Sequence, residues 1–572
     1  MTIAARPLPE TGARPGVALV RRAVRAPLWA HVFGLVLLLG ATAPLLKLDA
    51  SFTTDEGAYA HQAHSVEGGG WPVRQVSDVV DPSGRWFGMV NGSQGPNGNF
   101  TYTAHPLVVV VMARLASGLG DDVGLHLLPL AGVVGSAIAA WLLAGIVRPN
   151  DRRLSAAAFW VAATSPVLVN GTVIWAHTAS AALAGFALVG AVRIFERGVN
   201  AKSLALLGVT AAGGVLLRSE GLLFAGALTA ALMVGLWFRR ARTSAVVASA
   251  VVAGPAMVAY FIERRWVARI VGGPSLVQPA IRQVGGSWIS GRLSGGWHDL
   301  INPNAADLVA AVLGAIALSI VIFAGVKLRR LRVGEGREVA GLLTVALGLL
   351  LVRTFLRPIE TVTGLLAAWP LALVGLLAAA RWNRLPAAER FLAGVGLLFG
   401  AAVFATGYAE GGGQEWGGRF YFPLLVPMAV LAVVWLVRAA EGWTAADRRA
   451  LLAPLVAMAV VPSLLGLVVV RDLRVHSDHI VSDIAAVKPQ VIVTNSIALP
   501  RAAWRLRGVA WLRVDIPDMP DVVDQLRAAG IGPVAVVGPT PARSAEATTT
   551  LGRTVPAPHL ERAGYSLRVL DP

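Results

Sequence analysis

The chain contains no cysteine, and charged residues are scarce: 15% of its 572 residues are Asp, Glu, Lys or Arg, whereas 55% are hydrophobic. The absence of cysteine excludes disulfide bonds and metal sites built from thiolates. The scarcity of charge excludes an ordinary soluble protein, in which about a quarter of the residues are charged. The composition indicates a polytopic α-helical membrane protein.

Acidic residues are outnumbered, with 33 Asp and Glu against 50 Lys and Arg, so the formal net charge is +17. In a membrane protein, an excess of this sign collects in cytoplasmic loops that face anionic lipid. The sequence contains no nucleic-acid-binding motif, so we expect membrane lipids rather than nucleic acid as partners. Residues 1–27 are basic and rich in Pro and Gly, and we expect them to form a disordered cytoplasmic tail.

Hydropathy predicts about thirteen membrane crossings within a membrane domain over residues 28–470. The predicted crossings are 28–46, 123–147, 154–169, 172–195, 203–217, 221–238, 244–261, 308–326, 339–352, 361–380, 391–408, 420–437 and 451–470. Residues 106–119 are apolar but short for a crossing, and we expect a helix there that lies at the outer face.

The distribution of charge predicts the orientation of these crossings. With the N-terminal tail inside, the cytoplasmic loops are all rich in Lys or Arg, as expected; they are 193–202, 239–242, 327–337, 381–390 and 438–449. Residues 49–105 and 263–305 are then outer loops, and an odd number of crossings places the C-terminal region outside. We therefore expect a multi-pass protein of the plasma membrane.

Residues 471–572 have a different pattern. Residues 491–494, 509–514 and 534–537 are typical of short strands, and residues 518–529 of an amphipathic helix. This alternation predicts a small α/β domain with a partly parallel sheet, outside the membrane. No Gly-rich phosphate-binding fingerprint follows the strands, so we expect a structural or acceptor-binding role for this domain.

Two adjacent acids, Asp55 and Glu56, follow closely after the first predicted crossing. Carboxylates beside the hydrocarbon of a membrane are costly to desolvate, so ionisable residues there indicate a functional site. The plainer alternative is a solvated loop that happens to carry acids. Aromatic and histidine side chains are interleaved with the acids, and we expect Tyr59, His64 and, from a later loop, Trp416 to line a substrate cavity on the outer side.

Four arginines lie on the predicted outer side, against the charge bias: Arg218, Arg353, Arg357 and Arg419. One explanation is that each reaches toward the interface or pairs with a nearby acid. The acids available for such pairing are Glu220, Glu360 and Glu415. Four arginines together favour an anion, because the guanidinium fork matches phosphate and a membrane edge offers lipid phosphate. His105, before the short apolar helix, adds a further donor.

A lipid phosphate beside a carboxylate pair suggests a reaction. In a sugar carried on a polyprenyl phosphate, the anomeric carbon is bonded to a good leaving group. Its transfer to a hydroxyl acceptor needs a base for the hydroxyl and cations for the departing phosphate. In this hypothesis Asp55 or Glu56 supplies the base and the arginines supply the cations. We expect a polyprenyl-phosphate sugar donor and a glycan, lipid or protein acceptor.

The motifs resemble those of the GT-C class of integral membrane glycosyltransferases, in particular the protein O-mannosyltransferase and aminoarabinose transferase branch. The similarity covers roughly residues 28–437, and it lies in residues 55–59 (Asp-Glu-Gly-Ala-Tyr), 105–107 (His-Pro-Leu), 218–221 (Arg-Ser-Glu-Gly) and 416–420 (Trp-Gly-Gly-Arg-Phe). The resemblance implies an inverting enzyme with an outward-facing active site. It also implies a polyprenyl-phosphate donor and a base from the first outer loop, and Asp55 matches that acid. We then expect Glu56 to orient the acceptor, bind a metal ion or pair with an arginine.

The chain departs from the family pattern in two places. Its short apolar helix begins His-Pro-Leu where relatives often show a lysine and two prolines, and residues 67–99 form an unfamiliar Gly-rich insertion. These departures leave the sugar and the acceptor open. The bias toward Ala, Arg and Gly resembles that of high-GC actinobacteria, whose envelopes use decaprenyl-phosphate arabinose and mannose.

A metal site is a separate hypothesis. His61 and His64 are three residues apart beside Glu56 and Glu67, and on a helix this spacing places both imidazoles on one face, which suits a divalent ion. Such histidines are more often solvated or bind substrate, so no cofactor is required and a divalent metal ion stays open. His177, near the outer end of the fourth crossing, either lines the same cavity or packs in the core.

Two other functions fit a chain with many crossings. A lipid or solute transporter should carry charges near the bilayer midplane or show repeated halves with broken helices, whereas the predicted crossings are almost free of charge. A non-catalytic scaffold for envelope assembly would act through residues 471–572. Such a scaffold should tolerate the loss of either carboxylate, and an enzyme should not.

Overall fold

The computed structural model describes residues 26–71, 81, 85–88, 93–95, 98–100, 105–272, 288–301, 308–328, 336–356, 361–380, 382–406, 415–441, 443–506, 508–540 and 551–570. Residues 1–25 of the predicted tail lie outside the described residues, as do Arg357 and Glu360 and the side chain of Arg353.

The membrane part is built from α-helices. Its first half contains α2 (Leu28–Thr42), η1 (Ala43–Leu46), α3 (Thr54–Glu67), α4 (Pro106–Leu119), α5 (Asp121–Val147), α6 (Arg152–Ala163), α7 (Pro166–Asn170), α8 (His177–Arg197), α9 (Ala201–Leu217), α10 (Glu220–Phe238) and α11 (Arg242–Val271). Its second half contains α12 (Trp288–Gly296), η3 (Trp297–Ile301), α13 (Leu308–Leu328), α14 (Gly336–Leu356), α15 (Leu365–Ala368), α16 (Leu371–Ala379), η4 (Trp382–Arg384), α17 (Ala387–Thr406), η5 (Arg419–Leu424), α18 (Leu425–Ala440) and α19 (Ala445–Ala485).

Among the described residues, eight helical segments are long and apolar enough to cross a membrane. They are α2 with η1, α5, α8, α10, α11, α17, η5 with α18, and α19. Every predicted crossing coincides with one or two described helices, although the count of about thirteen stays a prediction. The chain is a multi-pass α-helical membrane protein.

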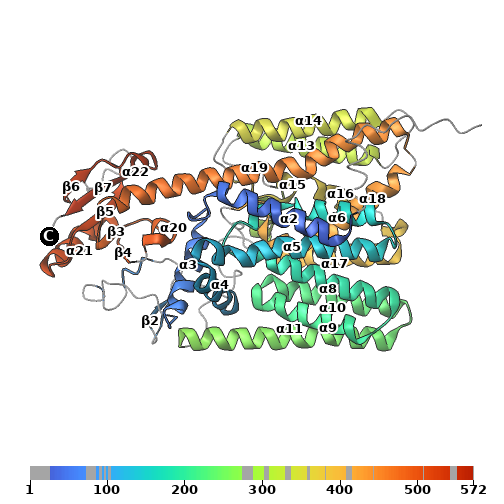
Figure 1. Cartoon of the computed structure of the whole chain (residues 1–572), viewed down its shortest axis with the longest axis horizontal. Coiled ribbons are helices and arrows are strands. Elements are labelled where there is room, and N and C mark those ends of the chain that lie inside the picture. Colours follow the sequence, from blue (N-terminus) through green and yellow to red (C-terminus); the bar gives the residue numbers. More distant parts are fainter. Residues whose placement is uncertain are drawn as a thin grey trace, which may run out of the picture.

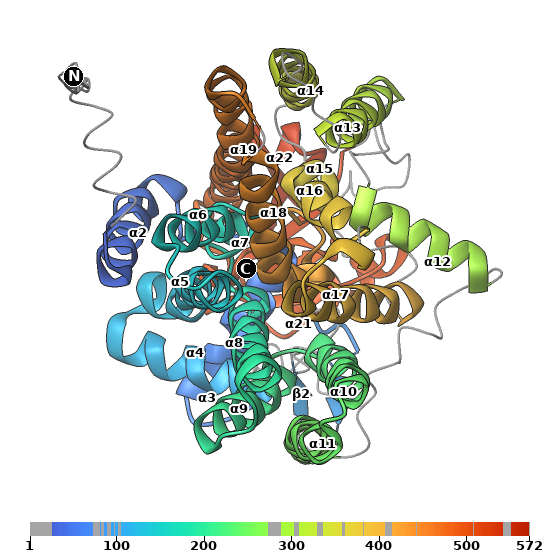
Figure 2. The ribbon, with the colours of Figure 1, turned by 90° about the vertical axis from the view of Figure 1, so that its right-hand side faces the viewer.

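Helix α18 is the central helix of the membrane part (Figure 2). Its residues from Leu425 to Trp435 are all buried, and it packs against α5, α6, α8, α16 and α17. A helix that is apolar on all sides belongs in such an interior position. The 3₁₀-helical segment η5 leads directly into α18 and begins at Arg419. This arginine therefore stands at the end of a buried central helix.

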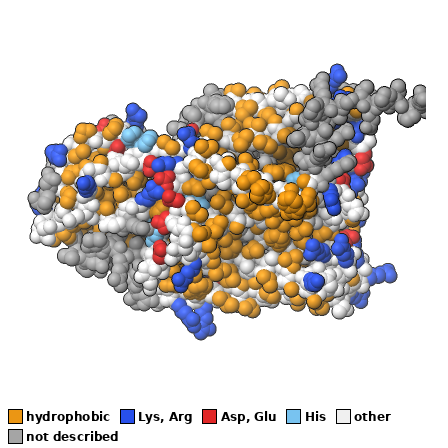
Figure 3. Space-filling model, viewed as in Figure 1, with side chains coloured by type: hydrophobic (Ala, Val, Ile, Leu, Met, Phe, Trp, Pro, Cys, Tyr) orange, Lys and Arg blue, Asp and Glu red, His pale blue; other side chains and the backbone are white. Residues whose placement is uncertain are grey.

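Hydrophobic side chains cover the face of the membrane part seen in Figure 3, and charged side chains gather toward its two ends. One charged group lies where the membrane part meets the C-terminal domain. The ion pairs there include Arg505 with Asp49 (2.7 Å) and with Asp122 (3.1 Å). An apolar belt between two charged rims is the surface expected of a protein that sits in a bilayer.

The C-terminal domain contains a five-stranded sheet in the order β4-β3-β5-β7-β6. Its strands are β3 (Val491–Thr494), β4 (Ala510–Arg513), β5 (Val534–Pro539), β6 (Arg553–Val555) and β7 (Tyr565–Leu570). Strand β3 is parallel to β4 and β5, whereas β7 is antiparallel to β5 and β6. The predicted small α/β domain is confirmed. The sequence pattern did not predict β6 and β7, because both strands include partly exposed positions.

Helices cover both faces of this sheet. They are α20 (Leu499–Ala502), η6 (Trp504–Leu506), η7 (Ile516–Asp518), α21 (Met519–Ala528) and α22 (Pro558–Arg562), together with the end of α19. Val522 of α21 belongs to the core on one face with Val491 and Val493, and Ile484 of α19 belongs to the core on the other face with Ile492. Successive strand residues point to opposite faces, which is why the continuous apolar run of β3 serves both cores.

One helix joins the two parts of the molecule. Helix α19 runs for 41 residues from the membrane part into the C-terminal domain (Figure 1). The predicted domain boundary at residue 471 therefore lies inside a continuous helix rather than in a linker. This helix holds the α/β domain at the end of the membrane part where α3 and α4 lie (Figure 1).

The two predicted outer loops contain regular structure. The first, residues 49–105, includes α3 and the antiparallel strands β1 (Ser93–Gly95) and β2 (Gly98–Phe100). It also contacts the C-terminal sheet, since the backbone N–H of Arg513 donates to the carbonyl of Trp86 (2.8 Å). In the second, residues 263–305, α11 continues to Val271 and α12 and η3 follow. The hydropathy had indicated that this helix ends near residue 262. The structure shows that α11 continues through the polar residues that follow.

Candidate active site

Helix α3 begins with a capping box, which explains half of the acidic pair. The hydroxyl of Thr53 accepts from the backbone N–H of Glu56 (3.3 Å), and Glu56 Oε2 accepts from the backbone N–H of Thr53 (3.1 Å) and from that of Phe52. This reciprocal arrangement satisfies the free N–H groups at a helix start. The Thr-x-x-Glu spacing in the sequence is its signature.

The remaining oxygen of Glu56 is also occupied. Glu56 Oε1 accepts from the backbone N–H of Ile174 (3.0 Å) and from Arg474 Nη2 (2.7 Å). The same Nη2 donates to the carbonyl of Thr172 (2.6 Å). Neither Glu56 nor Arg474 exposes any side-chain surface to solvent. Of the roles left open for Glu56, the structure shows the pairing with an arginine: its carboxylate joins α3, α19 and the segment before α8. A role of Glu56 in catalysis stays a prediction that these contacts do not favour.

Asp55 faces in another direction and meets Arg419. Its Oδ2 lies 2.8 Å from Arg419 Nη1, which donates a hydrogen bond to it. The Asp55 side chain is 39% exposed, whereas that of Arg419 is 13% exposed. The guanidinium of Arg419 also lies over the ring of Trp175, 5.1 Å from its centroid. Asp55 is thus a solvent-accessible carboxylate held against a nearly buried arginine.

A second arginine reaches Asp55 from the C-terminal domain. Arg501 of α20 donates from Nη2 to the hydroxyl of Thr54 (3.1 Å), and its Nη1 lies 3.8 Å from Asp55 Oδ1. Surrounding protein atoms disfavour the charged carboxylate, but Arg419, Arg501 and Arg218 outweigh this effect and lower the pKa of Asp55. Asp55 is therefore ionised at neutral pH. Sequence reasoning did not find Arg501, because it lies in a domain predicted to be separate.

The approach of α20 to α3 depends on Gly57. A Cβ atom at this position would lie 1.6 Å from the carbonyl oxygen of Arg501. Only glycine allows the two backbones to come so close. The glycine of the Asp-Glu-Gly motif is therefore what brings Arg501 beside Asp55.

Arg218 lies in the same region but has a carboxylate partner of its own. Its Nε and Nη2 donate to the two carboxylate oxygens of Glu220 (3.1 and 2.8 Å), which is the pairing that the sequence left open as an alternative. Arg218 also hydrogen bonds to the hydroxyl of Tyr59. Burial raises the pKa of Tyr59, and Arg218 partly opposes that effect. Tyr59 and Arg218 therefore adjoin the Asp55 region, and their roles as a cavity residue and a phosphate ligand stay predictions.

His105 pairs with a carboxylate that the sequence pattern did not indicate. Its Nδ1 lies 2.5 Å from Glu263 Oε1, and both side chains are largely buried. Glu263 is available because α11 extends beyond the predicted crossing. His105 therefore stands beside an acid rather than as an unpaired donor for phosphate. Arg353 and Arg357 stay predictions, since neither side chain is described.

Trp416 lies in the interior, and its predicted place in a substrate cavity stays a prediction. Its side chain is buried and packs against the backbone of Gly466, while its carbonyl accepts from Asn170 Nδ2 (2.7 Å). The next two residues have left-handed backbone angles, with φ +81° at Gly417 and +61° at Gly418. The Trp-Gly-Gly-Arg motif is thus a tight turn, anchored by the buried indole, that presents Arg419.

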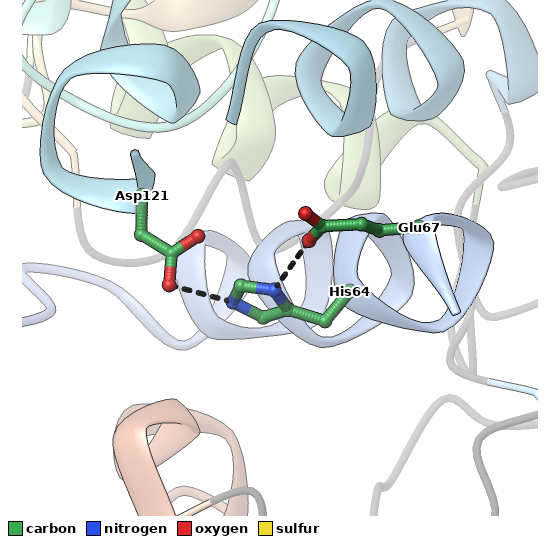
Figure 4. A group of neighbouring side chains, drawn as sticks. All are labelled: His64, Glu67 and Asp121. Carbon is green, nitrogen blue, oxygen red and sulfur yellow. Dashed lines mark hydrogen bonds and ion pairs between the residues drawn. The ribbon is translucent and has the colours of Figure 1, made fainter. Parts of the chain in front are cut away.

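His64 lies in the last turn of α3, where its ring points toward Glu67 and Asp121 (Figure 4). Its Nδ1 is 3.4 Å from a carboxylate oxygen of Glu67, and its Nε2 is 3.4 Å from one of Asp121. Its ring stacks on Trp504 of the C-terminal domain, with the centroids 5.8 Å apart. His64 therefore joins α3, the start of α5 and the α/β domain. Its predicted place in a substrate cavity stays a prediction.

The predicted metal set is only partly assembled. His64 and Glu67 come together with Asp121 instead of with His61 and Glu56. The ring of His61 faces the C-terminal domain, with Nε2 3.2 Å from the carbonyl oxygen of Pro500. Within the described part of the chain, a second group that could hold a metal ion consists of His298, Asp299 and Glu415.

His177 is buried, and among the described residues neither of its ring nitrogens has a hydrogen-bond partner. It lies beside Trp175, whose ring centroid is 4.7 Å from that of the imidazole. Trp175 in turn underlies Arg419. The structure therefore places His177 behind the Asp55 and Arg419 pair.

No protein-family model and no curated protein sequence matches the chain. Solved structures with low sequence identity are similar to it. One is the oligosaccharyltransferase of Archaeoglobus fulgidus in complex with Zn and sulfate, with 13% identity, coverage of 87% of this chain and 65% of that chain, and a TM-score of 0.46. The chain thus spans about two thirds of the length of that protein.

ArnT from Cupriavidus metallidurans is also similar, both in its apo state and bound to undecaprenyl phosphate. Each of these structures is 13% identical, covers 94% of this chain and 98% of that chain, and has a TM-score of 0.42. The oligosaccharyltransferase and ArnT belong to the GT-C class, which the sequence motifs of this chain also resemble.

Proposed function

We propose that the chain is a membrane glycosyltransferase that moves a sugar from a polyprenyl-phosphate donor to a hydroxyl acceptor on the outer face of the membrane. The observation that carries the proposal is the contact of Asp55 with Arg419, 2.8 Å apart. It combines an accessible, ionised carboxylate with a guanidinium at the end of the central helix. Arg501 adds a second cation from the C-terminal domain.

These groups match the two charges that develop in the reaction. The acceptor hydroxyl oxygen forms a bond to the anomeric carbon while the bond from that carbon to the phosphate oxygen breaks. The hydroxyl proton passes to Asp55, and the electron pair of the broken bond passes to the phosphate. Arg419 and Arg501 stabilise the negative charge on the departing phosphate, because a guanidinium fork is matched to phosphate oxygens.

The lowered pKa of Asp55 suits this role. At neutral pH the carboxylate is present in its basic form, ready to accept the proton as the attacking hydroxyl becomes acidic. The arginines that lower this pKa are the same ones that would contact phosphate. When a phosphate binds, Arg419 shares its donors between Asp55 and the donor lipid, so the base and the leaving group are held near each other.

The C-terminal domain takes part in the site in this proposal. Its α20 contacts α3 at Gly57 and places Arg501 beside Asp55. The acceptor, whether glycan, lipid or protein, then enters between this domain and the membrane part. A scaffold function would not need a carboxylate that two arginines keep ionised and that stays open to solvent.

The proposal is tested by sugar transfer in proteoliposomes. The purified protein is mixed with polyprenyl-phosphate arabinose or mannose and a hydroxyl acceptor, and the release of polyprenyl phosphate is followed by mass spectrometry. Arg419→Ala should lower kcat/KM by an amount that corresponds to about 2–4 kcal/mol of lost transition-state stabilisation. Arg419→Lys should restore only part of this loss, because lysine lacks the guanidinium fork. Arg505→Ala, at an exposed ion pair in the C-terminal domain, is the matched control and should have the wild-type rate. Equal rates for Arg419→Ala and wild type would contradict the proposal.

A further inference from the structure

A cluster of ionisable side chains beside Arg419 has no part in the proposed reaction. It consists of His298 and Asp299 from η3 and of Glu415, which precedes η5. One possible ligand atom from each of the three residues lies within 4.8 Å of the others. His298 Nδ1 is 2.9 Å from Asp299 Oδ1.

Glu415 is the member of the cluster whose negative charge has the fewest stabilising contacts. Its side chain is completely buried, and among the described residues neither carboxylate oxygen has a well-aligned hydrogen-bond donor, although the backbone N–H of Arg419 lies nearby. Arg419 Nε lies 3.0 Å from Oε2 but is not aligned as a hydrogen-bond donor. A completely buried carboxylate is costly unless hydrogen-bond donors or a cation stabilise it, and His298 and Asp299 lie close enough to share a cation with Glu415.

We infer that His298, Asp299 and Glu415 bind a divalent metal ion of the Mn²⁺ or Zn²⁺ type. One imidazole with two carboxylates is a ligand set that such ions accept, and no thiolate is needed. The separation of 2.9 Å between His298 Nδ1 and Asp299 Oδ1 suits two neighbouring ligands of one ion. Metal–ligand bonds of about 2.1 Å place adjacent ligands about 3 Å apart.

The second candidate group in the described part of the chain differs from this cluster in the surroundings of its carboxylates. There, each nitrogen of His64 faces its own carboxylate, from Glu67 on one side and Asp121 on the other (Figure 4). The side chains of Glu67 and Asp121 are 38% and 29% exposed, so water can stabilise their charge without a metal ion, whereas Glu415 is completely buried. This group therefore serves as the matched comparison.

The ion would fix the turn that carries Arg419. Gly418 packs directly on η3, since a Cβ atom on it would lie 2.3 Å from the carbonyl oxygen of Asp299. The hydroxyl of Thr363 donates to the carbonyl of His298 (3.2 Å) and holds η3 from the other side. A metal ion shared by η3 and Glu415 joins these two segments, and so it positions Arg419 against Asp55. This inference rests on the cluster itself and not on the proposed sugar transfer.

The test is direct metal binding by the full chain, purified without a histidine tag, treated with EDTA and then titrated with Mn²⁺ or Zn²⁺. Bound Mn²⁺ is counted from the electron paramagnetic resonance signal of the free ion, and bound Zn²⁺ by equilibrium dialysis with elemental analysis. Wild type should bind about one ion per chain. Glu415→Gln and His298→Gln should lose that ion, and the matched variant Glu67→Gln should keep it.

Two results would overturn the inference: no tightly bound ion in wild type, or full binding by folded Glu415→Gln and His298→Gln chains. Loss of the ion in Glu67→Gln alone would also overturn it and would move the site to the His64 group. His298 is partly exposed, so its variant is expected to fold even where Glu415→Gln does not. Because binding is read without any sugar transfer, an inactive chain that still binds the ion would contradict only the proposed function.

Discussion

Glu56 and Arg474 form an ion pair in which both side chains are completely buried and Arg474 Nη2 lies 2.7 Å from Glu56 Oε1. The pair holds the start of α3 against α19, the helix that continues into the C-terminal domain. Adjacent Asp55 instead faces Arg419 and solvent. Successive side chains of a helix point about 100° apart, so these two neighbouring acids have different partners.

Removal of Arg474 should destabilise the protein strongly. Arg474→Met leaves the buried carboxylate of Glu56 without its counter-charge, which should lower the free energy of unfolding by about 3–5 kcal/mol. The change is measured as a lower melting temperature in detergent. Arg505→Met, which breaks exposed pairs with Asp49 and Asp122, is the control and should cost under about 1 kcal/mol.

The same pair separates a structural role from a catalytic one. Glu56→Gln should lower the melting temperature but leave the rate of sugar transfer per folded molecule close to that of wild type, because Glu56 has no oxygen left for substrate. A stable Glu56→Gln protein with no activity would instead return Glu56 to the chemistry.

Gly57→Ala should weaken the contact between the membrane part and the C-terminal domain. A Cβ atom there would meet the carbonyl oxygen of Arg501 at 1.6 Å, so α20 must move, with an expected cost of about 1–3 kcal/mol. Sugar transfer should fall with it, because Arg501 leaves Asp55. Gly40→Ala, in α2 with no atom within 4 Å of the added Cβ, should leave stability and activity unchanged. Equal behaviour of the two variants would show that α20 does not dock as described.

The pH dependence of sugar transfer should depend on the charges of the arginines around Asp55. Their charge lowers the pKa of this carboxyl, so the basic form is present at neutral pH and is lost only as the pH falls below the ordinary aspartate range. Arg501→Gln removes one of the lowering charges and should shift the acidic limb of kcat/KM to higher pH. Arg505→Gln is the matched control and should leave the limb in place. An unshifted limb in Arg501→Gln would mean that Asp55 does not control the rate.

The orientation of the chain can be read with topology reporters. Reporters fused after Lys202, Arg240 and Arg449 should be cytoplasmic, because these positions lie in predicted loops rich in Lys and Arg. A reporter fused after Pro489, between α19 and β3, should be external. A cytoplasmic reading at Pro489 would place the C-terminal domain and Asp55 on the inner side and contradict an outer-face reaction.

The sequence predicted the elements whose burial shows as a local pattern. The run Val491 to Thr494 is apolar because both faces of β3 are covered, and it appears in the structure with the predicted bounds. The capping box of Thr53 and Glu56 is also visible in the sequence as Thr-x-x-Glu. That spacing is sufficient to assign Glu56 as a capping residue, because the motif is local to one helix turn.

The contacts that define the candidate site join residues far apart in the sequence. A local sequence pattern therefore could not predict them. Arg501 reaches Asp55 only because α20 packs on Gly57, and Arg474 reaches Glu56 only because α19 passes behind α3. A pattern of charge along the chain predicts on which side an arginine lies but not which carboxylate it meets. The charge bias did single out Arg419 as a candidate, because a cation on the predicted outer side breaks the rule that the other loops follow.

The most direct test of the account is the rate of sugar transfer by Asp55→Asn. The amide keeps the size of the side chain and can still accept a hydrogen bond from Arg419, but it cannot take up the proton of the acceptor hydroxyl. Turnover should fall by about 100-fold or more, with the melting temperature and the copurified polyprenyl lipid unchanged. Asp49→Asn, a nearby acid paired with Lys47 and Arg505, is the control and should turn over like wild type. An Asp55→Asn protein that transfers sugar at the wild-type rate would contradict the assignment of Asp55 as the base.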